Sequence, residues 1–139
     1  MEKLFVDTNI LVYFYNKNSP FHELALITLS ELSDSHDFVI STQTLREYAR
    51  VMSIVVSLEG AFYHIEEFYS QFEMIYESEG SFNIWMDLAK ENNIMGKALF
   101  DCNIVATMLT NKVRKILTNN PKDFDKFKNL IEIVPLIKD

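Results

Sequence analysis

The sequence has little cysteine, glycine or proline, with one, three and three of these among 139 residues. The single cysteine, Cys102, excludes an internal disulfide framework and a cluster of thiolate metal ligands, and it is compatible with a reducing cytoplasm. No stretch rich in Gly, Pro or Ser is long enough to be a linker. We therefore expect one domain, residues 1–139, in the cytoplasm.

Long hydrophobic runs and a surplus of positive charge are also missing. No apolar run approaches the roughly 18 residues that a membrane span needs, and the segment before Asp7 is too short for a secretory signal. We expect no contact with a membrane. Asp and Glu number 20 against 13 Lys and Arg, a formal charge of -7, which excludes nucleic-acid binding through bulk positive charge.

Short apolar segments alternate with segments of helical periodicity. We expect strands at 4–6, 38–40, 72–76, 115–117 and 131–134. Helices are expected from 10, over 19–33 with Ser19 as N-cap, from 41 or 42 to Gly60, and over 61–71, 81–92 and 97–111. This alternation predicts a three-layer α/β/α fold around a mostly parallel sheet of four or five strands.

Three acidic residues have apolar neighbours. Asp7 directly follows the first strand, Glu47 lies near the start of an apolar helix, and Asp101 lies within the most apolar helix. Burying an unpaired carboxylate costs several kcal/mol, so each position requires a hydrogen-bond partner, an ion pair or a metal. Helix capping by Asp7, an ion pair from Glu47 to Arg46 or Arg50, and a cap or buried pair at Asp101 stay open as alternatives.

The predicted topology brings these acids together. Loops that leave the carboxyl ends of parallel strands gather at one edge of a sheet. Asp7, Glu47 and the pair Asn119-Asn120 belong to that edge, and Asp101 joins them if its helix runs back along the sheet. A cluster of carboxylates without nearby His or Cys suits a hard divalent cation such as Mg²⁺ or Mn²⁺.

Four segments occur in a characteristic order and spacing. They are Phe5-Val6-Asp7-Thr8-Asn9, Ile40-Ser41-Thr42-Gln43-Thr44-Leu45-Arg46-Glu47, Asp101-Cys102-Asn103-Ile104-Val105-Ala106 and Leu117-Thr118-Asn119-Asn120-Pro121-Lys122-Asp123-Phe124. Through them the chain resembles, from end to end, a PIN-domain ribonuclease, and most closely a VapC-type toxin of prokaryotic toxin-antitoxin systems. The resemblance implies a single PIN-like domain.

The resemblance also implies roles for particular residues. Asp7, Glu47 and Asp101 match the acids that bind the metal. A fourth acid of the family is replaced by Asn120, which binds a cation with less charge, and Asp123 is the alternative for this position. Two further residues would support the acids by hydrogen bonding, namely Thr118 and Asn9.

The implied function is metal-dependent hydrolysis of RNA phosphodiester bonds by the toxin of a type II toxin-antitoxin system. Its implied cofactor is Mg²⁺ or Mn²⁺, and its implied partners are RNA, a second copy in a homodimer, and a cognate antitoxin. A non-catalytic PIN-like module that binds RNA or protein is the alternative, because Asn120 replaces an acid.

Charge and aromatic residues are unevenly distributed. Residues 1–96 contain 15 acids and 5 bases, whereas residues 97–139 contain 5 acids and 8 bases. Lys97 and Lys122 flank Asp101 and Asn120 and are our first candidates for RNA contacts. Between Val51 and Ala89 there is no base, but there are seven acids and eight aromatics. We expect these aromatics mainly in the core, with a dimer or antitoxin surface as the alternative.

Overall fold

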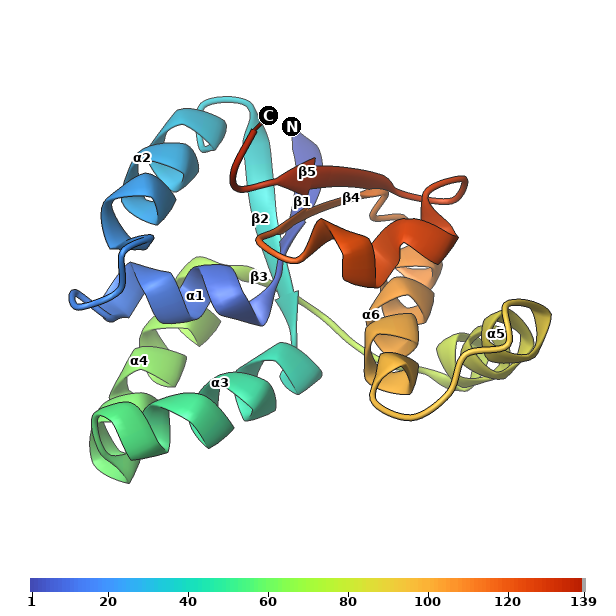
Figure 1. Cartoon of the computed structure of the whole chain (residues 1–139), viewed down its shortest axis with the longest axis horizontal. Coiled ribbons are helices and arrows are strands. Elements are labelled where there is room, and N and C mark those ends of the chain that lie inside the picture. Colours follow the sequence, from blue (N-terminus) through green and yellow to red (C-terminus); the bar gives the residue numbers. More distant parts are fainter. Residues whose placement is uncertain (139) are drawn as a thin grey trace.

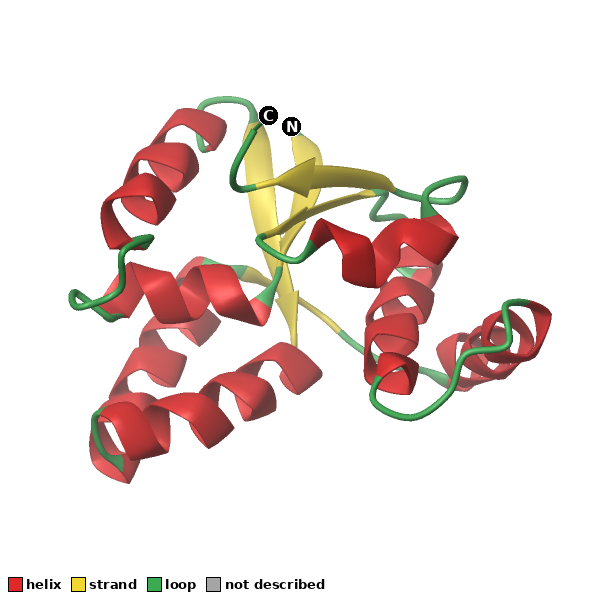
Figure 2. Cartoon of the chain, viewed as in Figure 1, coloured by secondary structure: helices red, strands yellow, loops and turns green. Residues whose placement is uncertain are grey.

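A five-stranded parallel sheet forms the centre of the computed structural model, which describes residues 1–138 (Figures 1 and 2). The strands are β1 (Glu2–Val6), β2 (His36–Ser41), β3 (Glu73–Ile75), β4 (Lys115–Thr118) and β5 (Glu132–Pro135). Their order is β3-β2-β1-β4-β5, and each neighbouring pair is parallel. This confirms the expected α/β fold and its parallel sheet.

Helices connect the strands and cover both faces of the sheet. They are α1 (Thr8–Tyr15), α2 (His22–Leu32), α3 (Thr42–Val55), α4 (Leu58–Gln71), α5 (Glu79–Glu91), α6 (Ala98–Thr110) and the 3-10 helix η1 (Pro121–Phe127). Helices α1 to α4 pack on one face, and α5, α6 and η1 pack on the other (Figure 1). None of the described helices is both long and apolar enough to cross a membrane.

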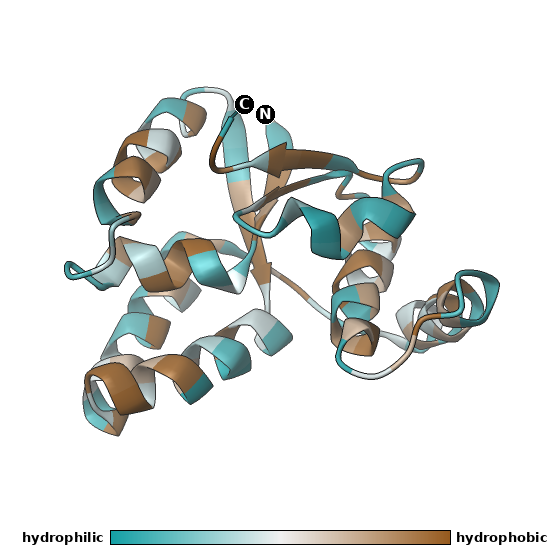
Figure 3. Cartoon of the chain, in the orientation of Figure 1, coloured by the Kyte–Doolittle hydropathy of each residue, from teal (hydrophilic) through white to brown (hydrophobic). Residues whose placement is uncertain are grey.

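Alternate residues of the strands belong to two separate cores, one on each face of the sheet. Leu4 and Val6 of β1 belong to the cluster formed with α1 to α4, whereas Phe5 between them belongs to the cluster with α5, α6 and η1. All three are fully buried. A parallel sheet that is covered on both faces needs such continuous apolar strands, and Figure 3 shows hydrophobic residues along the strands.

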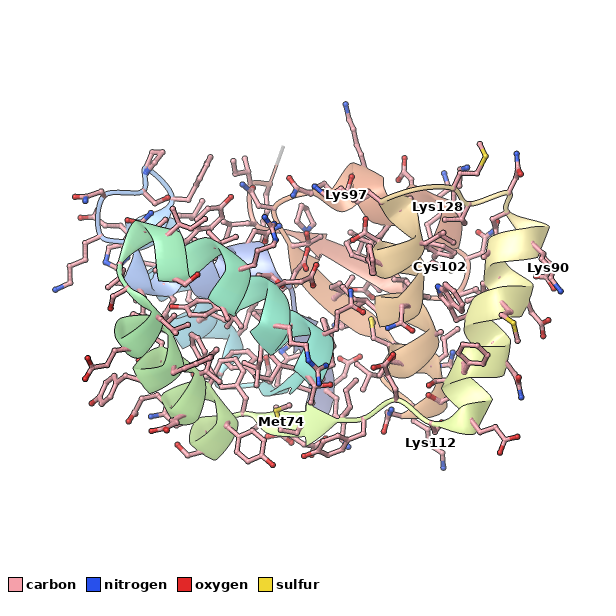
Figure 4. All side chains as sticks on the ribbon, turned by 90° about the horizontal axis from the view of Figure 1, so that it is seen from below. Met74, Lys90, Lys97, Cys102, Lys112 and Lys128 are labelled. Carbon is pink, nitrogen blue, oxygen red and sulfur yellow. The ribbon has the colours of Figure 1, made fainter. Side chains whose placement is uncertain are left out.

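Cys102 lies in the second core. Its side chain is fully buried on α6, and its Sγ contacts the Trp85 carbonyl oxygen at 3.7 Å. Burial raises the pKa of the thiol to about 11, so the thiolate is disfavoured. Figure 4 shows Cys102 further along α6 than Lys97, which stands at the start of the helix.

Four of the predicted helix starts are wrong. Helix α1 begins at Thr8 and not at Ile10, because Asp7 is its N-cap. Helix α2 begins at His22, because the Ser19 side chain accepts a hydrogen bond from Phe21 N within a turn and does not cap the helix. The break expected at Gly60 lies earlier, because Ser57 caps α4 by accepting a hydrogen bond from Gly60 N at 2.9 Å.

Helix α5 also starts earlier than predicted. Its N-cap is Ser78, and Ser81, the expected first residue, occupies the third helical position. The two serines form a capping box, in which each side chain accepts a hydrogen bond from the backbone N–H of the other. A capping box built from two serines is less visible in a sequence than the usual pair of Ser or Thr with Glu.

The expectation that the aromatic residues of 51–89 belong mainly to the core is wrong for most of them. Phe68 is buried, and Phe72 and Trp85 are partly buried. Five others are at least half exposed: Phe62, Tyr63, Tyr69, Tyr76 and Phe82. Aromatic side chains are therefore exposed outside the core on α4, on α5 and at Tyr76 between β3 and α5.

Candidate functional site

The carboxyl ends of β1, β2 and β4 meet at one edge of the sheet. Asp7 follows β1, α3 with Glu47 follows β2, and Asn120 comes two residues after β4. Helix α6 precedes β4, so it runs back along the sheet and presents Asp101 in its first turn to the same edge. The sequence placed Asp101 with the other acids only if its helix ran back along the sheet, and the helix does so.

Asp7 caps α1 and is held from both sides. Its Oδ1 accepts a hydrogen bond from Thr8 N at 2.9 Å, and its Oδ2 accepts one from Thr118 Oγ1 at 2.7 Å and one from Asn9 Nδ2 at 3.3 Å. The side chain is only 9% exposed. Burial raises the pKa of Asp7, and these hydrogen bonds offset part of that effect. Asp7 therefore caps α1, as the capping alternative predicted, and it also lies at the carboxyl edge of the sheet.

Thr118 and Asn9 connect β4 to the start of α1. Thr118 Oγ1 accepts a hydrogen bond from Asn120 N at 3.0 Å, and Asn9 Oδ1 accepts one from Asn119 N at 3.2 Å. Thr118 is completely buried. The two residues thereby fix the loop after β4 against Asp7, in agreement with the supporting position expected for them.

Glu47 lies beside Asp7 on α3. Its Oε1 accepts hydrogen bonds from Thr8 Oγ1 at 3.3 Å and Gln43 Nε2 at 3.5 Å. Burial, and then the charge of Asp7, raise the pKa of Glu47. Within the described residues, Glu47 makes no ion pair within 4.0 Å with Arg46 or Arg50, so the ion-pair alternative is wrong.

The pKa of Asp101 is raised as well. Burial, followed by the charges of Asp123, Asp7 and Glu47, raises its pKa to about 7, while Lys97 acts in the opposite direction. Asp123 has the largest effect among these charges. Carboxylates that face one another in this way favour the binding of a cation or a proton.

A single pocket of about 280 Å³ contains all of these acids. It is lined by Asp7, Thr8, Asn9, Val12, Tyr13, Glu47, Arg50, Val51, Lys97, Asp101, Asn120 and Asp123. Both candidates for the fourth position, Asn120 and Asp123, are therefore present. Lys97 reaches the same pocket, whereas Lys122 lies in a neighbouring pocket that shares Asp101 and Asp123.

The chemistry of the donors fits a hard divalent cation. The pocket offers carboxylate and amide oxygens and no His or Cys. In residues 1–138, no three His, Cys, Asp or Glu side chains are arranged closely enough to hold one ion by themselves. This is compatible with Mg²⁺, which is usually held by one or two carboxylates and keeps several waters for a phosphate-bearing substrate.

Comparison with known families decides the classification. The family model described as the PIN domain matches residues 4–130. The chain belongs to the PIN-domain family. No curated protein sequence matches the chain.

Several solved structures share this PIN fold over nearly their whole length. A chain of VapBC2 from Rickettsia felis, bound to a promoter DNA fragment, is 26% identical with a TM-score of 0.73, covering 94% of this chain and 98% of that one. A toxin-antitoxin complex from Klebsiella pneumoniae is 20% identical with a TM-score of 0.72, covering 98% and 99%. Mycobacterium tuberculosis VapC20, a toxin that cleaves the sarcin-ricin loop, is 14% identical with a TM-score of 0.62, covering 81% and 86%.

Sequence reasoning missed three residues of this PIN-domain site. Thr8 and Gln43 hydrogen-bond Glu47, and Tyr13 OH accepts a hydrogen bond from Asn119 Nδ2 at 2.9 Å. Gln43 precedes Glu47 by four residues on α3, a spacing that places both on one face of a helix. That spacing was the available signal for Gln43, while the contact of Tyr13 depends on the tertiary fold.

Proposed function

We propose that this PIN domain is a metal-dependent endoribonuclease and the VapC-type toxin of a type II toxin-antitoxin system. The observation that carries the proposal is the convergence of Asp7, Glu47, Asp101 and Asp123 on one pocket at the carboxyl edge of the sheet. These residues come from four separate parts of the chain. Capping or local pairing explains single acids, but it does not explain four around one space.

The proposed cofactor is Mg²⁺ or Mn²⁺, held by Asp7, Glu47 and Asp101 partly through bound water molecules, because no three acids in residues 1–138 are close enough to hold one ion by themselves. We assign the fourth position to Asp123 in preference to Asn120, because the charge of Asp123 acts on both Asp7 and Asp101. When bound, such a cation activates water and stabilises negative charge on a phosphoryl group. Asn120 then serves as a neutral ligand or as a donor to water at the rim.

The other residues of the pocket orient the acids and attract the substrate. Thr118 and Asn9 fix the Asp7 carboxylate, and Thr8 holds Glu47 against it. Lys97 places a positive charge at the mouth of the pocket, where it would contact an RNA phosphate. Lys122 lies one pocket further away, so its proposed phosphate contact is to a more distant nucleotide.

The proposed partners are a cognate antitoxin and a second copy of the chain. Chains of similar fold occur in VapBC complexes, in a toxin-antitoxin complex and in FitAcB from Neisseria gonorrhoeae. Here α4, with Phe62 and Tyr63 exposed, and α5, with Phe82 exposed, lie on opposite sides of the sheet, and each offers an acidic, aromatic surface for such partners. A cytoplasmic location fits these roles, because the proposed substrate is cellular RNA.

Cleavage of RNA in the presence of Mg²⁺ or Mn²⁺ tests the proposal. The wild-type protein should cleave at least one of the tRNA, rRNA and mRNA classes, and a chelator should abolish cleavage. Asp7→Asn, Glu47→Gln and Asp101→Asn should each lower the rate by about a hundredfold or more, because each removes charge from the metal ligands. Equal cleavage by the variants, or none by the wild type, overturns the assignment.

A second candidate function is a non-catalytic module that binds RNA or protein. Two observations favour it: Asn120 replaces an acid of the family, and within residues 1–138 no three acids are arranged to hold an ion by themselves. This alternative predicts that the wild type binds RNA and leaves every class intact with either cation. The cleavage assay therefore separates the two functions.

A further inference from the structure

A second and larger pocket adjoins the acidic one. It has a volume of about 610 Å³ and is lined by Gln43, Arg46, Glu47, Arg50, Glu77, Lys97, Phe100, Asp101 and Asn103. Glu47, Arg50, Lys97 and Asp101 line both pockets, so the two pockets adjoin at these side chains. Its size lies within the range of pockets that accommodate a small organic ligand.

Three cations make this pocket suitable for a polyanion. Arg46 and Arg50 are four residues apart on α3, and Lys97 stands at the start of α6 (Figure 4). All three side chains are exposed. The pocket also has three acids: Glu47 and Asp101 are proposed metal ligands, and Glu77 Oε1 accepts a hydrogen bond from Asn103 Nδ2 at 2.8 Å. A polyanion that enters here reaches the acids at Asp101.

Phe100 gives the same pocket an exposed aromatic face. It lies in the first turn of α6, directly before Asp101, and 62% of its surface is exposed. Cys102 of the same helix is fully buried in the core, whereas Phe100 is not part of that core. An exposed aromatic ring beside three cations is the combination with which proteins bind single-stranded nucleic acid.

The wall that carries Phe100 is held rigidly. Gln43 Nε2 donates a hydrogen bond to the Phe100 carbonyl oxygen at 3.0 Å, and Gln43 Oε1 accepts one from Asn103 Nδ2 at 2.7 Å. Asn103 also binds Glu77, which follows β3. Helix α3, helix α6 and the segment after β3 are thereby joined around the pocket, which lowers the entropy cost of ordering a ligand there.

We propose that Phe100 stacks on an unpaired base of the RNA beside the cleaved phosphate, and thereby selects single-stranded segments. Arg46 and Arg50 contact the backbone of the same nucleotide stretch. The inference rests on the proposed nuclease function. Stacking needs an accessible base face, and in a duplex both faces of each base are covered by neighbouring pairs. RNA is favoured over a protein ligand because the pocket shares Glu47 and Asp101 with the proposed cleavage site.

Binding of fluorescent RNA measures this role. The probe is a single-stranded oligonucleotide of about 12 nucleotides, titrated in Mg²⁺ by anisotropy, with its integrity checked on a gel. Phe100→Ala should weaken binding by about 5- to 150-fold, the range expected for one stacked base, and Phe100→Trp should restore most of it. Ile27→Ala is the control and should bind as the wild type does, because Ile27 is 55% exposed on α2, outside the pocket.

A second probe separates stacking from a general loss of affinity. On an oligonucleotide of the same length without bases, the wild type and Phe100→Ala should bind equally. Equal binding of the normal probe by wild type and Phe100→Ala, or the same loss on both probes, overturns the inference. A change from dimer to monomer in Phe100→Ala also overturns it, because the ring would then belong to a contact between copies.

The outcome is independent of the cleavage assay. If the wild type cleaves RNA and Phe100→Ala binds and cleaves unchanged, the stacking role fails and the nuclease stands. If the wild type cleaves nothing but loses affinity with Phe100→Ala on the normal probe alone, the nuclease fails and the base-binding pocket stands as part of a binding module.

Discussion

The carboxylate of Asp7 is fixed before any ligand arrives. Thr8, Asn9 and Thr118 all donate hydrogen bonds to it, although only 9% of the residue is exposed. Burial nevertheless raises its pKa. The surrounding donors thus set the orientation of the carboxylate while leaving its charge undercompensated, which is the condition that a cation would relieve.

Removal of the Thr118 hydroxyl tests this positioning. Thr118→Val keeps the shape of the side chain but loses its hydrogen bonds to Asp7 Oδ2 and Asn120 N. We expect a loss of about 10- to 100-fold in metal affinity or cleavage rate, the usual effect of changing a residue that orients a ligand. Thr110→Val is the control, because the Thr110 hydroxyl bonds only to carbonyl groups of α6. Equal titrations of the two variants with Mn²⁺ would contradict this role.

Variants of Asp123 and Asn120 test which of the two residues occupies the fourth acidic position. Asp123→Asn should lower Mn²⁺ affinity more than Asn120→Ala does, because the Asp123 charge acts on Asp7 and Asp101. We expect about a tenfold loss for Asp123→Asn in calorimetry, by analogy with other residues around metal sites. Asp125→Asn should change nothing, because Asp125 is exposed outside the pocket. The reverse order for Asp123 and Asn120 would reassign the position to Asn120.

At the scale of elements, α5 supports the part of α6 that carries the site. Trp85 Nε1 donates a hydrogen bond to the Leu99 carbonyl oxygen at 2.8 Å, in the first turn of α6 and next to Phe100. Trp85 also packs in the core between these helices. The start of α6, which lacks a side-chain cap of its own, is therefore held in place by a neighbouring helix.

The capping box of α5 contributes measurably to stability. Ser78→Ala removes the acceptor for Ser81 N, so we expect a loss of about 1 kcal/mol in the free energy of unfolding. Urea denaturation measures this loss. Ser70→Ala, on the exposed surface of α4, should change stability by less than about 0.5 kcal/mol. A Ser78→Ala protein as stable as Ser70→Ala would show that the capping box contributes nothing.

The sequence predicts the elements of this fold better than their boundaries. Strands such as 4–6 and 115–117 are visible because both faces of a parallel sheet are covered and the strands are continuously apolar. The starts of α2, α4 and α5 depended on which of several nearby serines bonds the backbone, a choice that only tertiary packing makes.

The candidate site was predictable in part for the same reason. Asp7, Glu47 and Asp101 are conspicuous because they are acids in apolar segments, and the topology of a parallel sheet brings their segments together. Thr8 and Phe100 carry no comparable signal. An exposed phenylalanine in an apolar helix looks like a core residue until the packing of that helix is known.

At the scale of the whole molecule, the charge of -7 is concentrated in functionally distinct places. Part of it lines the pocket at the carboxyl edge of the sheet, where a divalent cation would neutralise it. Another part lies on α4 and α5 beside exposed aromatic side chains. The acidic balance is therefore compatible with RNA binding through the cations around the pockets, even though it excludes binding through bulk charge.

The raised pKa of Asp101 lowers the folding stability of the metal-free protein above neutral pH. Its pKa is raised from 3.8 to about 7, so the folded state binds more protons than the unfolded state between these values. This loss of stability is complete above pH 7 and disappears as the pH falls towards 4. In chelator at about pH 8, Asp101→Asn should therefore be more stable than the wild type by about 1 kcal/mol, a value reduced for solvent screening.

Thermal denaturation measures this difference. The gain corresponds to about 3 to 5 °C in Tm for a chain of this size, and it should shrink towards zero at about pH 4.5. Asp87→Asn, on the exposed side of α5, should follow the wild type at each pH. A difference between Asp101→Asn and wild type that is independent of pH would contradict the electrostatic explanation.

The central claim is that the acids at the carboxyl edge hold a divalent cation. Anomalous diffraction from a crystal grown with Mn²⁺ tests it most directly, because the signal locates the ion without an assumption about activity. We predict a peak within the pocket of Asp7, Glu47, Asp101 and Asp123, and its loss in Asp7→Asn. A peak held by other residues, or none at millimolar Mn²⁺, would contradict the claim.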